Sequence, residues 1–164
     1  MGLIFYVSLF DNSEIEYDFY DLEGESIKFD KYKEKYSILS FTFTGCPSIC
    51  PMMNLELNKL SAMYGDRINI VSINVDPKND TPENIKKFMT MNQYDWDILV
   101  GGQKDIERVI NNMLHQPNRK FESPDQHPAE LHLMNKNFDY IEGFFPVVQD
   151  MDVLIVKLDE LLKQ

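Results

Sequence analysis

The chain of 164 residues contains few of the residue types that most often carry chemistry: two cysteines, three histidines and one tryptophan. It is also poor in positive charge, with 16 Lys and Arg against 27 Asp and Glu and a net charge of -11. Nucleic-acid binding needs clustered basic side chains that displace counterions from phosphates, so this balance argues against a nucleic-acid partner. Long apolar runs are absent as well. The longest candidate, residues 3–10, is shorter than the roughly 18 residues of a membrane span and has no basic flank.

Length and composition favour a single domain. A hydrophobic fraction of 43% with 11 Phe is enough to fill one core, and 164 residues are too few for two domains of ordinary size. The sequence shows no internal repeat, low-complexity tract or Gly/Ser linker. We therefore expect residues 1–164 to form one domain, with residues 1–15 as a candidate N-terminal extension.

Both cysteines lie in one seven-residue stretch, GCPSICP (residues 45–51), directly after the apolar run of residues 37–43. Two cysteines placed at random would show this spacing of four on the order of once in a hundred trials. A buried strand followed by a turn and a helix places the turn at the carboxyl edge of a sheet, where α/β proteins bind ligands. Cys46 and Cys50 are therefore the first candidates for a functional site.

A helix is predicted to follow the cysteines, with Cys50 near the N-cap and Pro51 as its first residue, because proline has a suitable φ and needs no amide partner there. Apolar spacing extends this helix to about Tyr64, and Gly65 is a stop signal. The free amides and dipole of a helix N-terminus favour thiolate over thiol, so at least one cysteine should be reactive. The alternative is a structural disulfide or two buried thiols. It is less favoured, because closing a loop of three residues removes little chain entropy.

The remaining pattern predicts an α/β fold. Two apolar strands, residues 37–44 and 67–75, flank the cysteine-bearing helix and should run parallel in a β-α-β unit. Hairpins are predicted near both ends of the chain, with three further helices and one further strand. The expected elements are residues 16–22 with 26–29 (first hairpin), 81–91 (helix, N-capped by Thr81), 96–100 (strand), 104–114 (helix), 129–134 with 138–145 (second hairpin) and 150–162 (helix, capped by Asp150).

A histidine could complete a metal site at the cysteines. Two thiolates make a linear site, and an added imidazole makes a trigonal one suited to Cu(I), or to Cu(II) with a further donor. His115 is assigned to a helix end, where the dipole favours a cation. His132, five residues from His127, should lie on the opposite strand face as a surface or packing residue. His127, on a loop at the mouth of a strand, is the best candidate ligand, although a solvated loop histidine would have the same pattern.

Four segments, taken in order, give the chain a resemblance to a known family. They are FYDLEG (residues 19–24), FTFTGCPSICP (41–51), VDPKNDTP (75–82) and DQH (125–127). They resemble the leading hairpin, the CPxxCP metal loop, the DPxRDTP segment and the D-x-H element of the Sco/SenC copper chaperones. The resemblance covers about residues 19–143. It implies a thioredoxin-like fold with an extra N-terminal β-hairpin.

The resemblance also implies a function. Cys46 and Cys50 would be the thiolate ligands and His127 the imidazole ligand of a copper ion, Cu(I) or Cu(II). Such proteins deliver copper to, or reduce the cysteines of, the dinuclear copper centre of a haem-copper respiratory oxidase. The implied partners are a copper-accepting oxidase subunit and other copper chaperones, and the protein would be a monomer or weak dimer. Family members are usually membrane-anchored and face the periplasm or an equivalent extracytoplasmic space. No anchor is found in this sequence.

Two positions depart from the family pattern. Ser48 stands where the family commonly has Asp, which removes a carboxylate next to the metal. Asn79 replaces the usual Arg, which removes an ion pair expected near Asp80 or the site.

Two other functions compete with copper transfer. The first is a thiol:disulfide oxidoreductase in which one of Cys46 and Cys50 attacks a partner disulfide and the other resolves the mixed disulfide. The second is a peroxidase, which would need an arginine beside the thiolate. The sequence gives Arg67, Arg108 and Arg119 no evident place there. His127 separates copper transfer from the thiol:disulfide oxidoreductase, since a reductase has no need of it.

Overall fold

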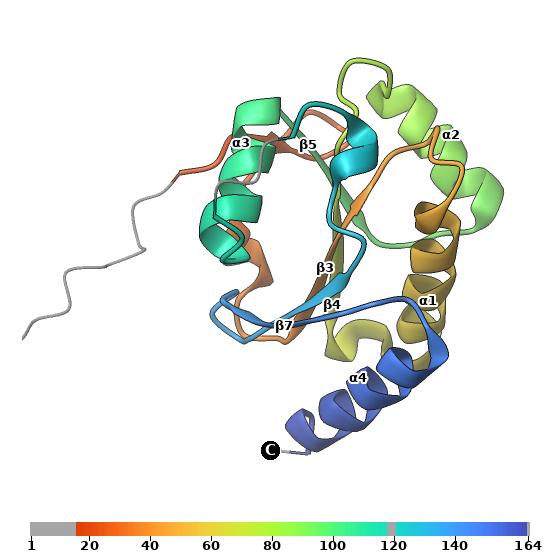
Figure 1. Ribbon diagram of the computed structural model, residues 1–164, viewed down its shortest axis with the longest axis vertical. Helices are drawn as coiled ribbons and strands as arrows, with labels where there is room; N and C mark the ends of the chain where they lie inside the picture. The colour runs from red at the N-terminus through yellow and green to blue at the C-terminus, as the bar shows by residue number, and fades with distance from the viewer. Residues whose placement is uncertain (1–15, 118–120, 164) are drawn as a thin grey trace, which may run out of the picture.

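The computed structural model describes residues 16–117 and 121–163, which form a seven-stranded sheet with helices on both faces (Figure 1). The expected extension of residues 1–15 and Arg119 lie outside the described residues. The strands are β1 (Phe19–Tyr20), β2 (Ser26–Ile27), β3 (Ser37–Thr42), β4 (Asn69–Asn74), β5 (Asp97–Gly101), β6 (Leu131–Met134) and β7 (Tyr140–Phe144). The α-helices are α1 (Ile49–Tyr64), α2 (Pro82–Asn92), α3 (Gln103–Arg108) and α4 (Val148–Leu161). None of the helices in this part of the chain is both long and apolar enough to cross a membrane.

The centre of the sheet is the predicted β-α-β unit. Strand β3 pairs in parallel with β4, from Ser37 opposite Asn69 to Thr42 opposite Asn74. All six residues of β3 are buried, as expected for a strand covered on both faces. Helix α3 covers one face, and α1, α2 and α4 cover the other (Figure 1). The parallel pairing places the carboxyl ends of β3 and β4 at one edge of the sheet.

Strand β6 determines what faces that edge. It pairs antiparallel with β3 on the side away from β4, with Leu39 opposite His132. Because the two strands run in opposite directions, the segment that enters β6 lies beside the end of β3. His127, four residues before β6, is therefore brought to the turn that carries the cysteines.

Helix α1 starts earlier than predicted. It begins at Ile49 with Ser48 as N-cap, so Cys50 lies in its first turn and Pro51 is its third residue rather than its first. This is compatible with proline, since the first few amides of any helix lack an intrahelical partner. The predicted apolar face is confirmed. It is buried against β3, β6 and α4 and consists of Met53, Leu57, Leu60 and Tyr64. Gly65, with φ of 55°, ends the helix as predicted.

Three other boundaries differ from the prediction. The strands of the first hairpin are only two residues long, and their antiparallel pairing is otherwise as expected. Helix α3 ends at Arg108 and continues as a π-helix over Val109–Met113, a change that leaves the apolar spacing almost unaltered. Helix α4 has Val147 rather than Asp150 as its N-cap. The carboxylate of Asp150 instead accepts a hydrogen bond from the backbone amide of Phe145 at 3.0 Å.

The N-terminal hairpin is fixed to the sheet through β5. Strand β1 pairs antiparallel with β5, with Phe19 opposite Gly101. A Cβ atom at Gly101 would lie 2.5 Å from the ring of Phe19, so this close approach requires glycine. The hairpin thus extends the sheet at the side away from β6 and β7.

Candidate metal and redox site

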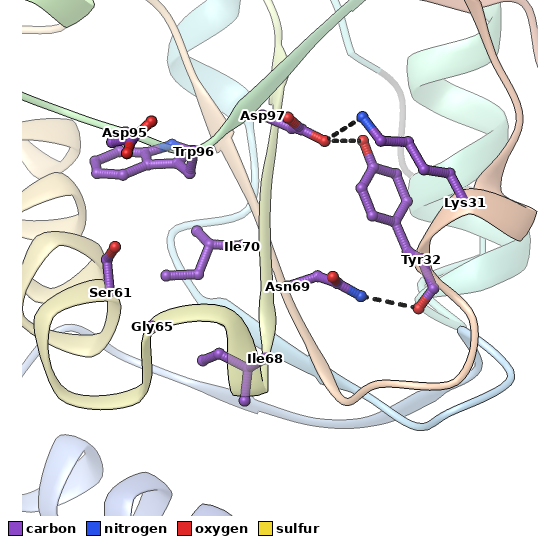
Figure 2. Close-up of a pocket in the computed structure, with 10 residues that line it drawn as sticks. All are labelled: Lys31, Tyr32, Ser61, Gly65, Ile68, Asn69, Ile70, Asp95, Trp96 and Asp97. Carbon is purple, nitrogen blue, oxygen red and sulfur yellow. Dashed lines mark hydrogen bonds and ion pairs between the residues drawn. The ribbon is translucent and has the colours of Figure 1, made fainter.

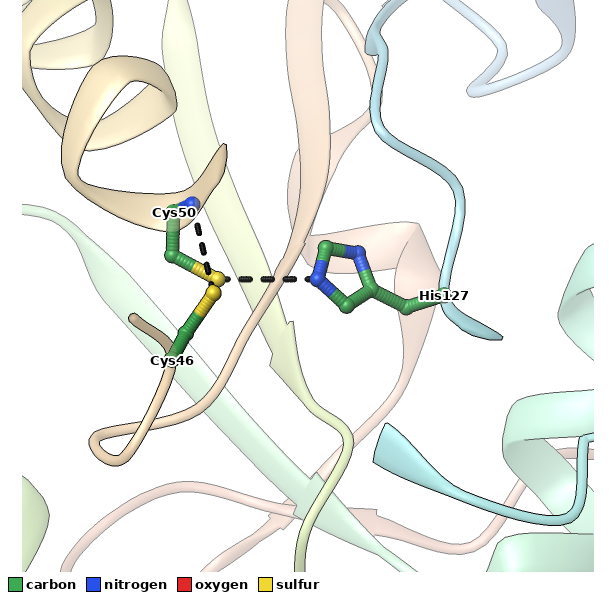
Figure 3. Close-up of side chains that lie close together, drawn as sticks. All are labelled: Cys46, Cys50 and His127. Carbon is green, nitrogen blue, oxygen red and sulfur yellow. Dashed lines mark hydrogen bonds between the residues drawn. The ribbon is translucent and has the colours of Figure 1, made fainter. Parts of the chain in front are cut away.

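The structure brings Cys46, Cys50 and His127 together at the carboxyl edge of the sheet. One donor atom from each of the three side chains lies within 4.8 Å of the other two, and Figure 3 shows them converging. Cys46 comes from the turn after β3, Cys50 from the first turn of α1 and His127 from the segment leading to β6. Both cysteines are free thiols in this structure.

The ring of His127 is held in one orientation. The residue is 5% exposed, and its ring packs edge-on against Phe43. Nδ1 lies 2.7 Å from the carbonyl oxygen of Pro128. A carbonyl can only accept a hydrogen bond, so we assign the ring proton to Nδ1. Nε2 then keeps its lone pair and lies 3.5 Å from Sγ of Cys50. This is the arrangement by which proteins usually orient a metal-binding imidazole.

Cys46 is the more reactive thiol. Its Sγ accepts a hydrogen bond from the backbone amide of Cys50 at 3.4 Å, so the first turn of α1 points an N–H at the sulfur. Burial alone would raise the pKa of Cys46, but hydrogen bonds from Cys50 and Ser48 outweigh it and lower the pKa below that of an ordinary thiol. Ser48 is an exposed residue whose side chain nonetheless reaches this sulfur. The serine that departs from the family pattern therefore acts on Cys46.

Cys50 has the opposite environment. It is 2% exposed, and this burial, together with the neighbouring Cys46 thiol, raises its pKa to about 12. The backbone of Phe43 and the hydroxyl of Thr42 oppose the shift. The buried Thr42 hydroxyl has no oxygen or nitrogen partner among the described residues, and the thiol of Cys50 is its neighbour. The two cysteines are thus chemically distinct, because the pKa of Cys46 is lowered and that of Cys50 is raised.

The other two histidines lie away from this group. His132 is fully buried in β6, where its ring packs against Phe41 and Tyr140, so it is a packing residue rather than a surface one. His115 is exposed, follows the π-helix and lies 6.1 Å from the ring of Tyr140 between centroids. The prediction that His127, and not His132, faces the cysteines agrees with this placement.

Of the arginines that a peroxidase could use, the two within the described residues, Arg67 and Arg108, are engaged elsewhere. The guanidinium of Arg67 lies over the ring of Tyr64 at 6.0 Å. Arg108 pairs with Asp105 at 2.7 Å and lies over the ring of Tyr17. Neither contact is with a residue of the cysteine turn.

Sequence reasoning did not assign the hydroxyl and carboxylate groups that support the site. Thr42, Thr44 and Asp80 have no characteristic spacing from the cysteines, and only the parallel pairing of β3 and β4 brings them together. Asn79, the second departure from the family pattern, turns away. Its side-chain amide donates to the carboxylate of Asp76 at 2.9 Å.

A hollow of about 300 Å³ lies at the opposite end of the sheet from the cysteines, where β4 and β5 begin (Figure 2). The carboxylate of Asp97 there accepts hydrogen bonds from Lys31 at 2.7 Å and from the hydroxyl of Tyr32 at 2.9 Å. Burial and this carboxylate raise the pKa of Tyr32. The lining contains no cysteine or histidine, so this hollow does not offer a soft-metal site.

The fold and the site define a class of protein: a thioredoxin-like α/β protein with two thiols and one imidazole at the carboxyl edge of its sheet. A family model described as SCO1/SenC matches residues 9–163, nearly the whole chain. The chain therefore belongs to the SCO1/SenC family.

Relatives and solved structures agree with this assignment. The chain is 31% identical over 144 residues to the SCO1 protein homolog of Bacillus subtilis, covering 81% of this chain and 74% of the relative. It is 28% identical over 156 residues to an SCO2-like protein of Rickettsia prowazekii, covering 90% and 74%. A SCO1/SenC family lipoprotein from Bacillus anthracis superposes with a TM-score of 0.74 at 25% identity, covering 90% of this chain and 96% of that one. Copper-bound yeast Sco1 shares the fold, with a TM-score of 0.65 at 22% identity and 90% of each chain covered.

Proposed function

We propose that this protein binds one copper ion through Cys46, Cys50 and His127 and passes it to a partner protein. The observation that carries the proposal is the convergence of two sulfurs and one unprotonated imidazole nitrogen within 4.8 Å. Thiolates are soft ligands that select Cu(I), and an imidazole completes a trigonal site. Copper-bound structures of the relatives from yeast and Bradyrhizobium japonicum support copper as the metal.

The unequal exposure of the ligands suits transfer of a metal that is cargo rather than a resident cofactor. Cys46 is partly exposed, whereas Cys50 and His127 are buried. An incoming partner thiolate can reach the metal from the Cys46 side and replace that ligand first. The two buried ligands keep the copper bound until the partner supplies a second donor. Release therefore depends on ligand exchange with the partner.

We further infer the identity of the acceptor and the location of the protein. A similar solved structure, BsSco, is described as a member of the Sco family of cytochrome c oxidase assembly proteins, which supports a copper-accepting subunit of a haem-copper respiratory oxidase as the acceptor. Other copper chaperones are the inferred donors. The lipoprotein relative from Bacillus anthracis supports attachment to a membrane surface, on the extracytoplasmic side where such an acceptor would be reached.

Copper titration of the reduced protein against a Cu(I) chelator tests the proposal. We expect one Cu(I) per chain and loss of that binding in Cys46→Ala and in Cys50→Ala, because the remaining donors lack the second sulfur. His127→Ala should weaken Cu(II) more than Cu(I), since Cu(I) tolerates two-coordinate sulfur ligation. His115→Ala is the matched control, because it removes an exposed histidine away from the site. Full copper retention by either cysteine variant would overturn the assignment.

Copper binding should also depend on redox state. A disulfide between Cys46 and Cys50 removes both thiolates, so the air-oxidised protein should bind no Cu(I), and proton competition should release the metal as pH falls. Equal copper content in oxidised and reduced samples would contradict the proposed ligand set.

The asymmetry of the two thiols favours one second function, a thiol:disulfide oxidoreductase. The Cys46 thiolate would attack a partner disulfide, forming a mixed disulfide and releasing one partner thiolate. Cys50 would then lose its proton and attack Cys46, releasing the second partner thiolate and leaving the Cys46–Cys50 disulfide. Trapping of a mixed disulfide by Cys50→Ser, but not by Cys46→Ser, would support this activity. Absence of any adduct with the oxidised acceptor would exclude it.

A further inference from the structure

The buried carboxylate of Asp80 holds the strand end that leads to Cys46. Asp80 is 5% exposed. Its Oδ2 accepts the backbone N–H of Thr44 at 2.8 Å and the side-chain amide of Asn74 at 2.7 Å, and its Oδ1 accepts the hydroxyl of Thr44. A buried carboxylate is tolerated only where hydrogen bonds replace its hydration, and these three bonds supply that replacement. The position and orientation of Asp80 are therefore fixed.

These bonds join three segments at the edge of the sheet that carries the site. Thr44 lies two residues after the end of β3, Asn74 is the last residue of β4, and Asp80 directly precedes Thr81, the N-cap of α2. Asn74 is itself fixed, since its side-chain oxygen accepts the backbone N–H of Asp76 at 3.1 Å. The carboxylate of Asp80 thus links the end of β3 to a rigid part of the fold.

Thr44 is the last strongly held residue before Cys46. A Cβ atom at the intervening Gly45 would contact only the ring of Phe43, at 3.9 Å. The backbone amide of Cys46 makes a long hydrogen bond of 3.4 Å to the carbonyl of Phe43. Cys50, by contrast, is fixed by α1. The position of the Cys46 sulfur relative to α1 therefore depends on how firmly Thr44 is held.

We propose that Asp80 is a positioning residue for Cys46. By holding Thr44, it keeps the cysteine turn where the Cys46 sulfur meets the backbone amide of Cys50. The consequence for metal binding rests on the proposed function, whereas the positioning itself acts on the metal-free dithiol. Asp80 touches neither thiol in the contacts described above and acts only through Thr44.

The test uses Asp80→Ala, with Asp80→Asn as the conservative control. Asp80→Ala removes all three hydrogen bonds that the carboxylate accepts from Thr44 and Asn74. In Asp80→Asn, the amide oxygen takes the place of Oδ2 and accepts both the backbone N–H of Thr44 and the side-chain amide of Asn74. The amide nitrogen then donates to the hydroxyl of Thr44, which changes from donor to acceptor, so the three contacts are kept.

Two rates are measured on the metal-free protein: alkylation of Cys46 by iodoacetamide at pH 7 in the reduced form, and displacement of glutathione by Cys50 from a Cys46 mixed disulfide prepared beforehand. Misplacement of a reacting atom slows such steps strongly, so Asp80→Ala should slow both by about tenfold. Asp80→Asn should stay close to the wild-type rates. Asp105→Asn, which breaks an ion pair with Arg108 away from the site, is the control: it should lower the melting temperature and leave both rates unchanged.

Thr44→Val keeps the backbone bond to Asp80 and removes only the hydroxyl, so it should fold and slow both rates by a smaller factor. It decides the matter if Asp80→Ala does not fold. Unchanged rates in folded Asp80→Ala or Thr44→Val, with a lower melting temperature alone, would overturn the positioning role. Failure of the wild-type protein to bind Cu(I) would instead overturn the proposed function, and the two rates would still test Asp80.

Discussion

Helices α1 and α2 follow neighbouring parallel strands and begin at the same edge of the sheet, but they use their first amides differently. At α2, the side chain of Thr81 accepts the backbone N–H of Asn84 at 3.2 Å, and Pro82 fills the first helical position. At α1, the N-cap Ser48 makes no side-chain capping bond. The amide of Cys50 instead meets the sulfur of Cys46.

The two helix N-termini therefore have different effects, one on the stability of a helix and the other on the reactivity of a thiol. An N-cap side chain that satisfies a free amide stabilises its helix by about 1 kcal/mol. A sulfur in the same place stabilises less as a thiol but gains a charged acceptor when it ionises, because the helix N-terminus favours negative charge. The first amides of α2 therefore contribute to stability, whereas those of α1 favour ionisation of the Cys46 thiol.

The largest expected effect is the loss of thiol reactivity when the sulfur at α1 is removed. In Cys46→Ser, the remaining thiol of Cys50 is 2% exposed, and burial, the largest cause of its raised pKa, is still present. Alkylation by iodoacetamide at pH 7, followed by mass spectrometry, should fall more than about a hundredfold. Cys50→Ser is the matched variant and should keep a reactive thiol. Rapid labelling of Cys50 in Cys46→Ser would refute the contrast between the two cysteines.

The second effect is a loss of stability at alkaline pH. The folded pKa of Cys50 lies above its unfolded value of about 8.5. Its contribution to stability is therefore fully present below about pH 8.5 and is lost as pH rises toward 12. Urea unfolding of the reduced protein should show a fall of about 2 kcal/mol between pH 8.5 and 11 that Cys50→Ser lacks. A parallel fall in both proteins would assign the loss to other groups, such as Tyr64, whose pKa is also raised to about 12 by burial and by Asp159.

The third effect belongs to α2. Thr81→Ala removes the bond to the amide of Asn84, so the free energy of unfolding should fall by about 1 kcal/mol. The alkylation rate of Cys46 should not change. Thr90→Ala, at an exposed position within the same helix, should have a much smaller effect on unfolding in urea. A cap variant that alters Cys46 reactivity would show that the two helix ends are coupled.

The smallest effect on stability is expected at Ser48. Because its side chain makes no capping bond, Ser48→Ala should change the free energy of unfolding by less than about 0.5 kcal/mol. The same change removes a hydrogen bond that lowers the pKa of Cys46, so alkylation should slow slightly. Ser48→Asp should raise this pKa through its negative charge and tighten Cu(II) binding with little effect on Cu(I). If Ser48→Asp changes neither the pKa of Cys46 nor the affinity for Cu(II), position 48 has no bearing on the site.

Local sequence signals predicted much of this fold. The apolar runs predicted β3 and β4 and their parallel pairing, and Thr81 with Pro82 predicted the start of α2 correctly. The predictions of helix boundaries failed where one sequence signal is compatible with two backbone conformations. Pro51 is acceptable at the first or the third position of a helix, since neither needs an amide partner. The π-helix Val109–Met113 is a similar case, because one extra residue in a turn barely alters the apolar spacing.

The sequence predicted the three donor residues of the candidate site but not the residues that hold them in place. The cysteine spacing and the loop position of His127 identified three side chains that the structure brings together. The roles of Thr44 and Asp80 were not predictable, since these residues lie 36 positions apart in sequence and meet only because β3 and β4 end side by side. Likewise, no pattern showed that Cys46 and Cys50 would differ in pKa, because the difference arises from the burial of Cys50 and from the hydrogen bonds to Cys46 in the folded chain.

The antiparallel pairing of β3 with β6 has a consequence for how the site assembles during synthesis and folding. His127 and Cys50 are 77 residues apart in sequence, whereas Cys46 and Cys50 are only 4 residues apart. During synthesis, which proceeds from the N-terminus, both thiols therefore emerge long before the histidine, and closing so long a loop is a late event in folding. A newly made chain passes through a stage with a complete dithiol and no imidazole. Oxidation or capture of a foreign metal at that stage would precede assembly of the three-donor site, so the nascent chain is the form most exposed to both.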